Sequence, residues 1–306
     1  MSTSVARQLS VALCALFLLP TLASIPAAGQ DVATIAQNRD ERQAFRIHGV
    51  TDEFVRSMAE LGYDRLDADQ LVAFRIHGVT PTFVKEMREL GFTEIDADQL
   101  VAFRIHGVRP VFIRDLRRQG YDLSADDAVA WRIHGVNAAF IADMAAIGYP
   151  KLTADDLVAF KIHRVDADFV EEMEDLGFPL LGADDLLAFR IHRINDRFMT
   201  EMHALGFDEL TPKEALRLRI YDVDRVFRDR MQNLGFSGFT PNRLVVMKML
   251  RVNESLLREL SGKTFEEISI EGLLRDRNNW SGRMNRYDDD LWEAIEDVVR
   301  ELTRMY

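Results

Sequence analysis

The sequence predicts an all-α fold, an α-solenoid of about seven to eight two-helix repeats with a helical C-terminal cap. A six-residue motif recurs about every 29 residues, helix-capping residues surround each copy, and the period is lost near the C-terminus. A fixed period of this length is typical of repeat proteins, whose units cannot bury their apolar faces alone and therefore stack on their neighbours.

The first copy of the motif is Phe45-Arg46-Ile47-His48-Gly49-Val50. Further copies occupy residues 74–79, 103–108, 131–136, 160–165 and 189–194, and degenerate copies occupy 218–223 and 247–252. Successive copies are 29 residues apart except for one step of 28, which coincides with a shorter loop between Gly120 and Ser124. Because connecting loops tolerate such changes in length, the shorter loop leaves the array of repeats intact.

Each repeat contains two predicted helices, and the second repeat illustrates the first of them. Thr80 is the predicted N-cap, and Pro81 follows at the first helical position, where its missing N–H costs nothing. Gly91 ends this helix in the left-handed conformation, and Phe92 closes a Schellman motif by packing back on Met87. Helical spacing predicts one apolar stripe made of Phe83, Val84, Met87 and Leu90.

The second helix of the same repeat begins after Asp96, where Gln99 completes a capping box, and it is terminated by Gly107. Phe103 and Ile105 lie inside this helix. The other second-helix caps are Asp67, Ser124, Thr153, Thr211 and Thr240, with Gly182 as the weak one. A methionine and an aromatic residue close the first helices, as Met58 with Tyr63, Met144 with Tyr149, Met173 with Phe178, Met202 with Phe207 and Met231 with Phe236.

Residues 1–29 have the pattern of a signal peptide. Arg7 precedes an apolar run from Leu9 to Leu22, and small residues follow it. This leader predicts export to the periplasm or the medium, and the alternative is an uncleaved membrane anchor. The only cysteine, Cys14, lies in the leader, which excludes disulfides and thiolate sites from the remaining residues.

The remaining chain divides into three predicted parts. Residues 30–43 form a polar N-terminal segment that is partly helical from about Ile35, 44–260 hold the tandem repeats, and 261–306 form the C-terminal capping helices. Two closing helices are expected at Phe265 to Arg275 and at Asp289 to Met305. A loop is expected between them, at 276–288.

Composition and motifs restrict the class of function. The net charge of −12 argues against broad nucleic-acid binding, which requires clustered cations. The sequence has no nucleophile elbow, phosphate loop or dinucleotide fingerprint. We therefore expect a protein without catalytic residues, cofactor or metal. The catalytic alternative is an unrecognised hydrolase built around His203, the one histidine outside the recurring motif.

The string Arg-Ile-His-Gly-Val, together with Leu-Thr-Ala-Asp-Asp-Leu at residues 152–157, resembles a known type of bacterial repeat. Similar tandem segments follow the membrane metallopeptidase portion of some BlaR/MecR-type sensor proteins and also occur in secreted proteins of unknown function. The resemblance covers roughly residues 44–260. It implies an extracytoplasmic accessory or sensory module and no proteolysis, because the sequence has no His-Glu-x-x-His string.

The motif aligns six histidines, at His48, His77, His106, His134, His163 and His192. Packed helices lie about 10 Å apart, whereas zinc ligands lie about 2 Å from one ion, so the column does not predict a metal site. Each histidine lies just before the helix-ending residue, where an imidazole can bond late carbonyls and complement the helix dipole. The column thus predicts a capping role, with pH sensing near about pH 6–7 as the alternative.

A second column carries one cation per repeat, at Arg46, Arg75, Arg104, Arg132, Lys161, Arg190 and Arg219. Cations near a helix C-terminus are favoured by the helix dipole, and the alternative is a stripe that grips an anionic partner. Arg164 and Arg193 replace the helix-ending glycine in two copies, although a left-handed arginine costs roughly 1 kcal/mol more than glycine. These two residues extend the stripe and are the most specific candidates for a binding surface.

Together these patterns predict a non-catalytic module that binds or senses a protein, peptide or envelope partner through its repeat surface. A nucleic-acid partner is not expected, and contact with a membrane is expected only through an uncleaved leader. The alternative is a structural element that oligomerises through its C-terminal helices. The sequence leaves the oligomeric state open.

Overall fold

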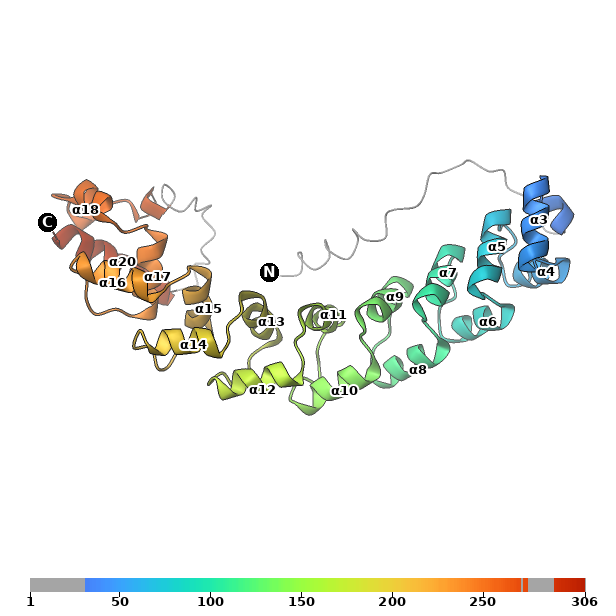
Figure 1. Cartoon of the computed structure of the whole chain (residues 1–306), viewed down its shortest axis with the longest axis horizontal. Helices are drawn as coiled ribbons and strands as arrows, with labels where there is room; N and C mark the ends of the chain where they lie inside the picture. Colours follow the sequence, from blue (N-terminus) through green and yellow to red (C-terminus); the bar gives the residue numbers. More distant parts are fainter. Residues whose placement is uncertain (1–30, 271, 275–288, 306) are drawn as a thin grey trace. The chain divides into compact units, whose positions relative to one another are not determined.

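The computed structural model describes residues 31–270, 272–274 and 289–305, so the predicted leader and the whole predicted 276–288 loop lie outside the described residues (Figure 1). The described residues form 19 helical elements and no strand, which confirms the predicted all-α repeat solenoid. None of these helices is long and apolar enough to cross a membrane.

Two kinds of helix alternate along the chain, the first helices of the repeats and the helices that carry the recurring motif, here called motif helices. The first helices are α4 (Asp52–Ala59), α6 (Pro81–Glu89), α8 (Pro110–Arg118), α10 (Ala138–Ala146), α12 (Ala167–Asp175), α14 (Asp196–His203), α16 (Arg225–Asn233) and α18 (Glu254–Leu260). The motif helices are α3 (Arg39–His48), α5 (Ala68–His77), α7 (Ala97–His106), α9 (Ala125–His134), α11 (Ala154–His163), α13 (Ala183–His192), α15 (Pro212–Ile220) and α17 (Pro241–Met249). The short helix α2 (Val32–Ile35) precedes them.

The chain divides into two compact units, the first ending at Ile162 and the second beginning at His163. In the first unit the motif helices α3, α5, α7 and α9 lie side by side in one layer, and the first helices form the other layer (Figure 1). Each motif helix therefore has one side against the first helices, two sides against its neighbours in the layer, and one side free.

The first helix of the second repeat begins and ends where the sequence predicts. The Thr80 hydroxyl accepts a hydrogen bond from the Phe83 amide at 3.2 Å and caps α6. Gly91 has a φ of +84°, in the left-handed region, and the Phe92 amide donates to the Met87 carbonyl at 3.1 Å. This is the bond of the predicted Schellman motif, and the same bond closes the other predicted methionine–aromatic pairs.

The motif helix of the same repeat also has the predicted caps. The Asp96 carboxylate accepts from the Gln99 amide at 2.8 Å, and the Gln99 side chain accepts from the Asp96 amide at 3.2 Å. Gly107 ends α7 with a φ of +70°. The weak cap is confirmed as well, because Gly182 offers no side-chain oxygen to the start of α13.

The core runs through both layers and is continuous between repeats within each unit. Phe83, Val84 and Met87 are buried, whereas Leu90 is half-exposed because it occupies the C-cap position of α6. Phe92 packs edge-to-face on Phe103 of the following motif helix, with ring centroids 5.2 Å apart. No polar or charged residue within the described part of the chain is buried. Apolar burial therefore stabilises the stack.

The hydroxyls of Tyr63 and Tyr121 bridge successive repeats. Tyr63 donates to the Ile95 carbonyl at 2.6 Å, and Tyr121 donates to the Leu152 carbonyl at 2.7 Å. Burial raises the pKa of both phenols, and the Asp156 carboxylate adds to the increase at Tyr121. Both groups therefore remain neutral hydrogen-bond donors at neutral pH.

The C-terminal helix α20 (Asp289–Arg304) closes the second unit by packing on α17. Its predicted apolar face is buried at Leu291, Ile295, Val298 and Leu302, whereas Met305 is half-exposed. The prediction of one continuous helix from Phe265 to Arg275 is wrong. A 3₁₀ helix, η1 (Phe265–Glu267), ends early, Ile268 is extended, and the Ser269 hydroxyl then caps a new turn by accepting from the Gly272 amide at 3.0 Å.

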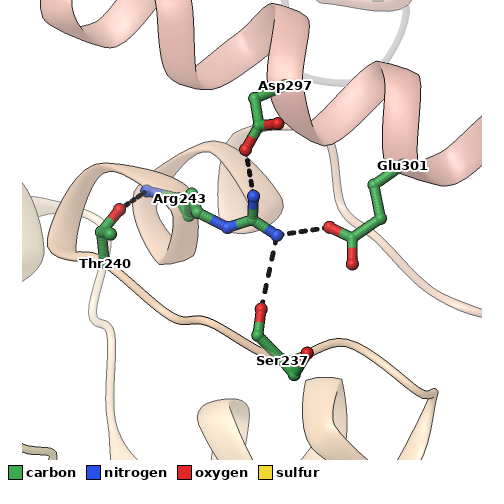
Figure 2. A network of polar contacts seen from close by, with 5 residues as sticks. All are labelled: Ser237, Thr240, Arg243, Asp297 and Glu301. Carbon is green, nitrogen blue, oxygen red and sulfur yellow. Dashed lines mark hydrogen bonds and ion pairs between the residues drawn. The ribbon is translucent and has the colours of Figure 1, made fainter.

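An ion-pair network fastens α20 to α17 (Figure 2). The Arg243 guanidinium of α17 lies between Asp297 and Glu301 of α20 and donates to both carboxylates. The same guanidinium approaches the Ser237 carbonyl at 3.5 Å, and the Arg243 side chain is only 15% exposed. A charge this shielded from water contributes more than a surface pair, so Arg243 helps to fix the cap in place.

Replacing Tyr63 with Phe should lower the free energy of unfolding at pH 7 by about 0.5–1.5 kcal/mol, because the Ile95 carbonyl loses its donor. The ring itself is tolerated, since Phe92 occupies the corresponding position of the next repeat. The difference between wild type and variant should shrink as the pH rises above about 10, where the raised pKa of the folded phenol makes ionisation favour unfolding. Urea unfolding at several pH values measures both effects.

Tyr221→Phe is the control, because the Tyr221 hydroxyl forms no hydrogen bond within the described residues. This substitution should change the free energy of unfolding by less than about 0.5 kcal/mol.

Replacing Arg243 with Met should weaken the C-terminal cap by about 1–2 kcal/mol, because two carboxylates lose their shared partner. Amide hydrogen exchange should then be roughly tenfold faster in α20, and the amides of α3 to α9 should be unaffected. Arg258→Met is the matched control, since its ion pair with Glu254 is exposed on both sides and contributes less than about 0.5 kcal/mol. Equal effects of the two substitutions would contradict the role given to Arg243.

Candidate binding surface

The cation of each motif helix reaches back to the preceding repeat. The Arg75 guanidinium lies over the Phe54 ring of α4, 5.0 Å from its centroid. The same arrangement, at 4.2 to 5.7 Å, recurs for Arg104 over Phe83, Arg132 over Phe112, Lys161 over Phe140, Arg190 over Phe169, Arg219 over Phe198 and Lys248 over Phe227. Six of the seven cations in the column predicted from the sequence, all except Arg46, are therefore engaged in contacts between repeats.

A hydrogen bond accompanies each of the arginine contacts. The Arg75 Nε donates to the backbone carbonyl of His48, at the end of the preceding motif helix, at 3.3 Å. The corresponding donors and carbonyls are Arg104 and His77, Arg132 and His106, Arg190 and His163, and Arg219 and His192. The predicted interaction with the helix dipole therefore involves two helices. Each of these arginines lies near the C-terminus of its own motif helix and also caps the C-terminus of the preceding one.

Glycine in the motif leaves room for this arginine. Gly78 has a φ of +72°, and a Cβ added there would lie 2.9 Å from Arg104 Nη2, closer than real Cβ contacts. Gly49 and Gly107 would place a Cβ 3.1 Å from the next arginine. The motif glycine therefore serves both the left-handed helix ending and the close approach of the following repeat.

The remaining candidate cations have no such contact. Arg46 is exposed on α3, and within the described residues no aromatic ring lies beneath it. Arg164 and Arg193 adopt the left-handed conformation at φ values of +57° and +56°, as the sequence predicts, and both are exposed. The structure thus places these three residues at the surface without bringing them together around a ligand.

Five of the six motif histidines, all except His134, contribute their carbonyls to the packing and not their side chains. Within the described part of the chain, none of the six imidazoles forms a hydrogen bond, so the predicted imidazole cap is replaced by the arginine of the next repeat. The residues described here contain no group of three His, Cys, Asp or Glu that could hold a metal. His203 is exposed at the end of α14. A role of the histidines in pH sensing stays a prediction.

The most regular exposed feature is a column of isoleucines that the sequence analysis did not identify. In the first unit these residues are Ile47 (67% exposed), Ile76 (55%), Ile105 (55%), Ile133 (48%) and Ile162 (50%), here called the isoleucine ribbon. Ile191 and Ile220 occupy the same motif position in the second unit and are 49% and 50% exposed. Seven of the ten large apolar side chains that are exposed in the described residues therefore occupy one position of the motif.

The geometry of the motif helix explains the exposure. Phe74 is completely buried, and two residues further along an α-helix a side chain points to the opposite side. Ile76 therefore lies on the free side of α5, away from the first helices, with the half-exposed Val72 one turn before it. The signal was present in the sequence, because a residue two positions after a core phenylalanine cannot share its face.

Charged rows flank the ribbon on both sides. The cations that cap the preceding repeat form one row, since Arg75 directly precedes Ile76 on α5 and reaches toward the His48 carbonyl and the Phe54 ring of α4. Exposed carboxylates stand at the opposite ends of the motif helices, at Asp69, Asp98, Asp126 and Asp155. Seven residues of helix, about 10 Å, separate Asp69 from Ile76. The surface is thus apolar at its centre, cationic along one edge and anionic along the other.

No family model, no curated protein and no solved structure matches this chain. The candidate surface therefore rests on the geometry described above.

Replacing Arg104 with Ala should lower the free energy of unfolding by about 1–2 kcal/mol, because it removes both the contact with Phe83 and the hydrogen bond to the His77 carbonyl. Arg46→Ala is the matched control at the same motif position and should change stability by less than about 0.5 kcal/mol. Urea unfolding of the two variants and the wild type measures the difference. If both variants lose the same stability, the cation does not hold the repeats together.

Proposed function

We propose that the protein is a non-catalytic, extracytoplasmic scaffold that binds a polypeptide partner along the isoleucine ribbon. The observation that carries this proposal is the repetition of one exposed isoleucine in seven of the eight motif helices, all except α17. Single exposed apolar residues are ordinary on protein surfaces, but an aligned series of them marks an interaction site. Stacked repeats suit this purpose, since they present an extended surface of regular spacing.

The ribbon replaces the cation column as the candidate contact surface. The cations are already held over aromatic rings and, for the arginines, against carbonyl groups, so they are fixed in position and are not free to rearrange around a ligand. Fixed side chains lose less entropy on binding, which makes them suitable edges for an apolar surface. The structure gives no further reason to place a separate binding site at Arg164 and Arg193.

Other proposals have less support. Oligomerisation through the C-terminal helices would need an exposed apolar face, but Leu291, Ile295 and Val298 of α20 are buried within the chain. A hydrolase would need a nucleophile beside a base, and His203 is exposed at the end of its helix. Export rests on the leader, and a sensory role rests on the resemblance to the repeats of BlaR/MecR-type sensors, so both remain predictions of the sequence.

The test is a triple substitution of the ribbon, Ile76→Ser, Ile105→Ser and Ile133→Ser, assayed against a displayed library of unstructured peptides. The three half-exposed side chains should each contribute roughly 1 kcal/mol when covered, so the variant should bind selected peptides roughly 100-fold more weakly than the wild type. Fluorescence anisotropy with the selected peptides measures the dissociation constants.

The matched control replaces three exposed apolar side chains that do not occupy the isoleucine position of the motif, Val111→Ser, Leu180→Ser and Val226→Ser, which are 55%, 79% and 68% exposed. This variant should bind the selected peptides within about threefold of the wild type. Circular dichroism and urea unfolding should show that both variants remain folded, since the substituted side chains are exposed. A library without any peptide that depends on the ribbon would refute the proposed function.

A further inference from the structure

Resting on the proposed function, we infer that the occupant of the isoleucine ribbon is an extended, acidic polypeptide in the polyproline II conformation, with an apolar side chain at every third residue. Three properties of the first unit point to this occupant: the spacing of the isoleucines, the donors along one edge of the ribbon and the length of the ribbon. Each property restricts the backbone that can lie along this surface.

The spacing follows from the packing of the motif helices. One isoleucine projects from each of five successive motif helices. The first four of these helices pack side by side, and packed helices lie about 8–10 Å apart. The fifth, α11, contacts the preceding repeat through Lys161 over Phe140. A polyproline II helix advances about 9.3 Å per turn of three residues, so every third side chain meets the next isoleucine. In a β-strand the side chains on one face recur about every 6.6 Å, so a strand returns to the ribbon only after about 20 Å, or two steps, and leaves every second isoleucine without a matching side chain.

The hydrogen-bond donors along one edge of the ribbon distinguish an extended partner from a helical one. Seven residues of an α-helix advance about 10.5 Å, just beyond one step of the ribbon, but the carbonyls of an α-helix are already bonded within it. A polyproline II chain has no internal hydrogen bonds and leaves its carbonyls free. Arg104 uses its Nε on the His77 carbonyl, and Arg132 does the same at His106, which leaves the outer N–H groups of these exposed guanidinium groups for an acceptor.

The charge of the surface selects an acidic partner. Along the cationic edge of the ribbon stand Arg75, Arg104, Arg132 and Lys161, one cation per step, each over an aromatic ring of the preceding first helix. The nearest row of carboxylates, which includes Asp69 and Asp98, lies about 10 Å further along the motif helices. An acidic side chain in each three-residue turn of the partner therefore faces a cation, and a basic side chain there is repelled.

The length of the ribbon sets the length of the partner. From Ile47 to Ile162 there are four steps, which corresponds to about four turns of polyproline II helix and about 13 residues. Each repeat contributes one similar contact, so affinity should increase by a similar factor with each added turn of the partner until all five isoleucines are covered.

The experiment compares three fluorescein-labelled peptides of 13 residues. The first repeats Leu-Pro-Glu four times and ends in Leu. The second has the same composition with Leu at alternate positions, Leu-Pro-Leu-Glu-Leu-Pro-Leu-Glu-Leu-Pro-Glu-Pro-Glu. The third has Lys in place of each Glu of the first. Fluorescence anisotropy with the whole protein should show that the first peptide binds at least about tenfold more tightly than the other two.

Variants of the protein and shorter peptides complete the experiment. Binding of the first peptide should be lost in the triple variant Ile76→Ser, Ile105→Ser and Ile133→Ser and retained in the off-ribbon variant Val111→Ser, Leu180→Ser and Val226→Ser. Peptides with two, three, four and five leucines should form a series of increasing affinity. A series that stops increasing at two leucines would contradict binding along the ribbon.

The outcomes separate this inference from the proposed function. Library peptides that need the ribbon but lack the three-residue period, or equal binding of the first two designed peptides, would overturn the inference and leave the proposed function standing. Equal binding of the acidic and basic peptides would overturn the charge assignment. If neither the library nor the designed peptides depend on the ribbon, both proposals fall together.

Discussion

The contact between a cation and the preceding repeat governs how the units of this protein stack. One side chain, such as Arg104, covers the Phe83 ring of the repeat before it and donates to the His77 carbonyl at the end of the preceding motif helix. It thereby satisfies a carbonyl that the helix leaves without a partner and shields an aromatic ring from water. Because the contact runs between repeats, it recurs at the period of the array and holds the two layers of helices in register.

This contact accounts for the composition of the motif. The phenylalanine faces the core, the cation faces backward, and the glycine both turns the chain and makes room for the next cation. Only one side of the motif helix is then left without a packing partner, and the isoleucine lies on that side. The regular apolar column is thus a consequence of the way the repeats pack, and its regularity is what makes it suitable for an extended partner with a matching period.

The end of the array follows a different rule. Most of α17 is buried because α20 covers the side that stays free on the earlier motif helices, and Arg243 fastens the two helices through Asp297 and Glu301. A last repeat without a following neighbour would expose its apolar side, so a covering helix is required for solubility. The cap therefore prevents further stacking at this end.

Local rules made most of the fold predictable. Thr80, Asp96 and Gly91 have their expected positions because caps and left-handed glycines depend on backbone geometry within a few residues. The continuous helix predicted at Phe265 is interrupted, since Thr264 and Ser269 each start a turn of their own and helical spacing of apolar residues does not show such a break. The site was predicted less well, because the cations of the sequence column turned out to be contacts between repeats.

The amino-acid sequence alone determines the repeat period, the helix boundaries and the separation of buried from polar faces. These features follow from residues that lie close together in the chain. The partner of each cation and histidine carbonyl lies about one repeat away, so only the stacking of the units could assign them. The arginines in the left-handed conformation show the same difference between what the sequence determines and what the packing determines. Arg193 keeps the helix ending that glycine adopts elsewhere, because the packed Ile194 beyond it donates to the Phe189 carbonyl and the shared core outweighs the local strain.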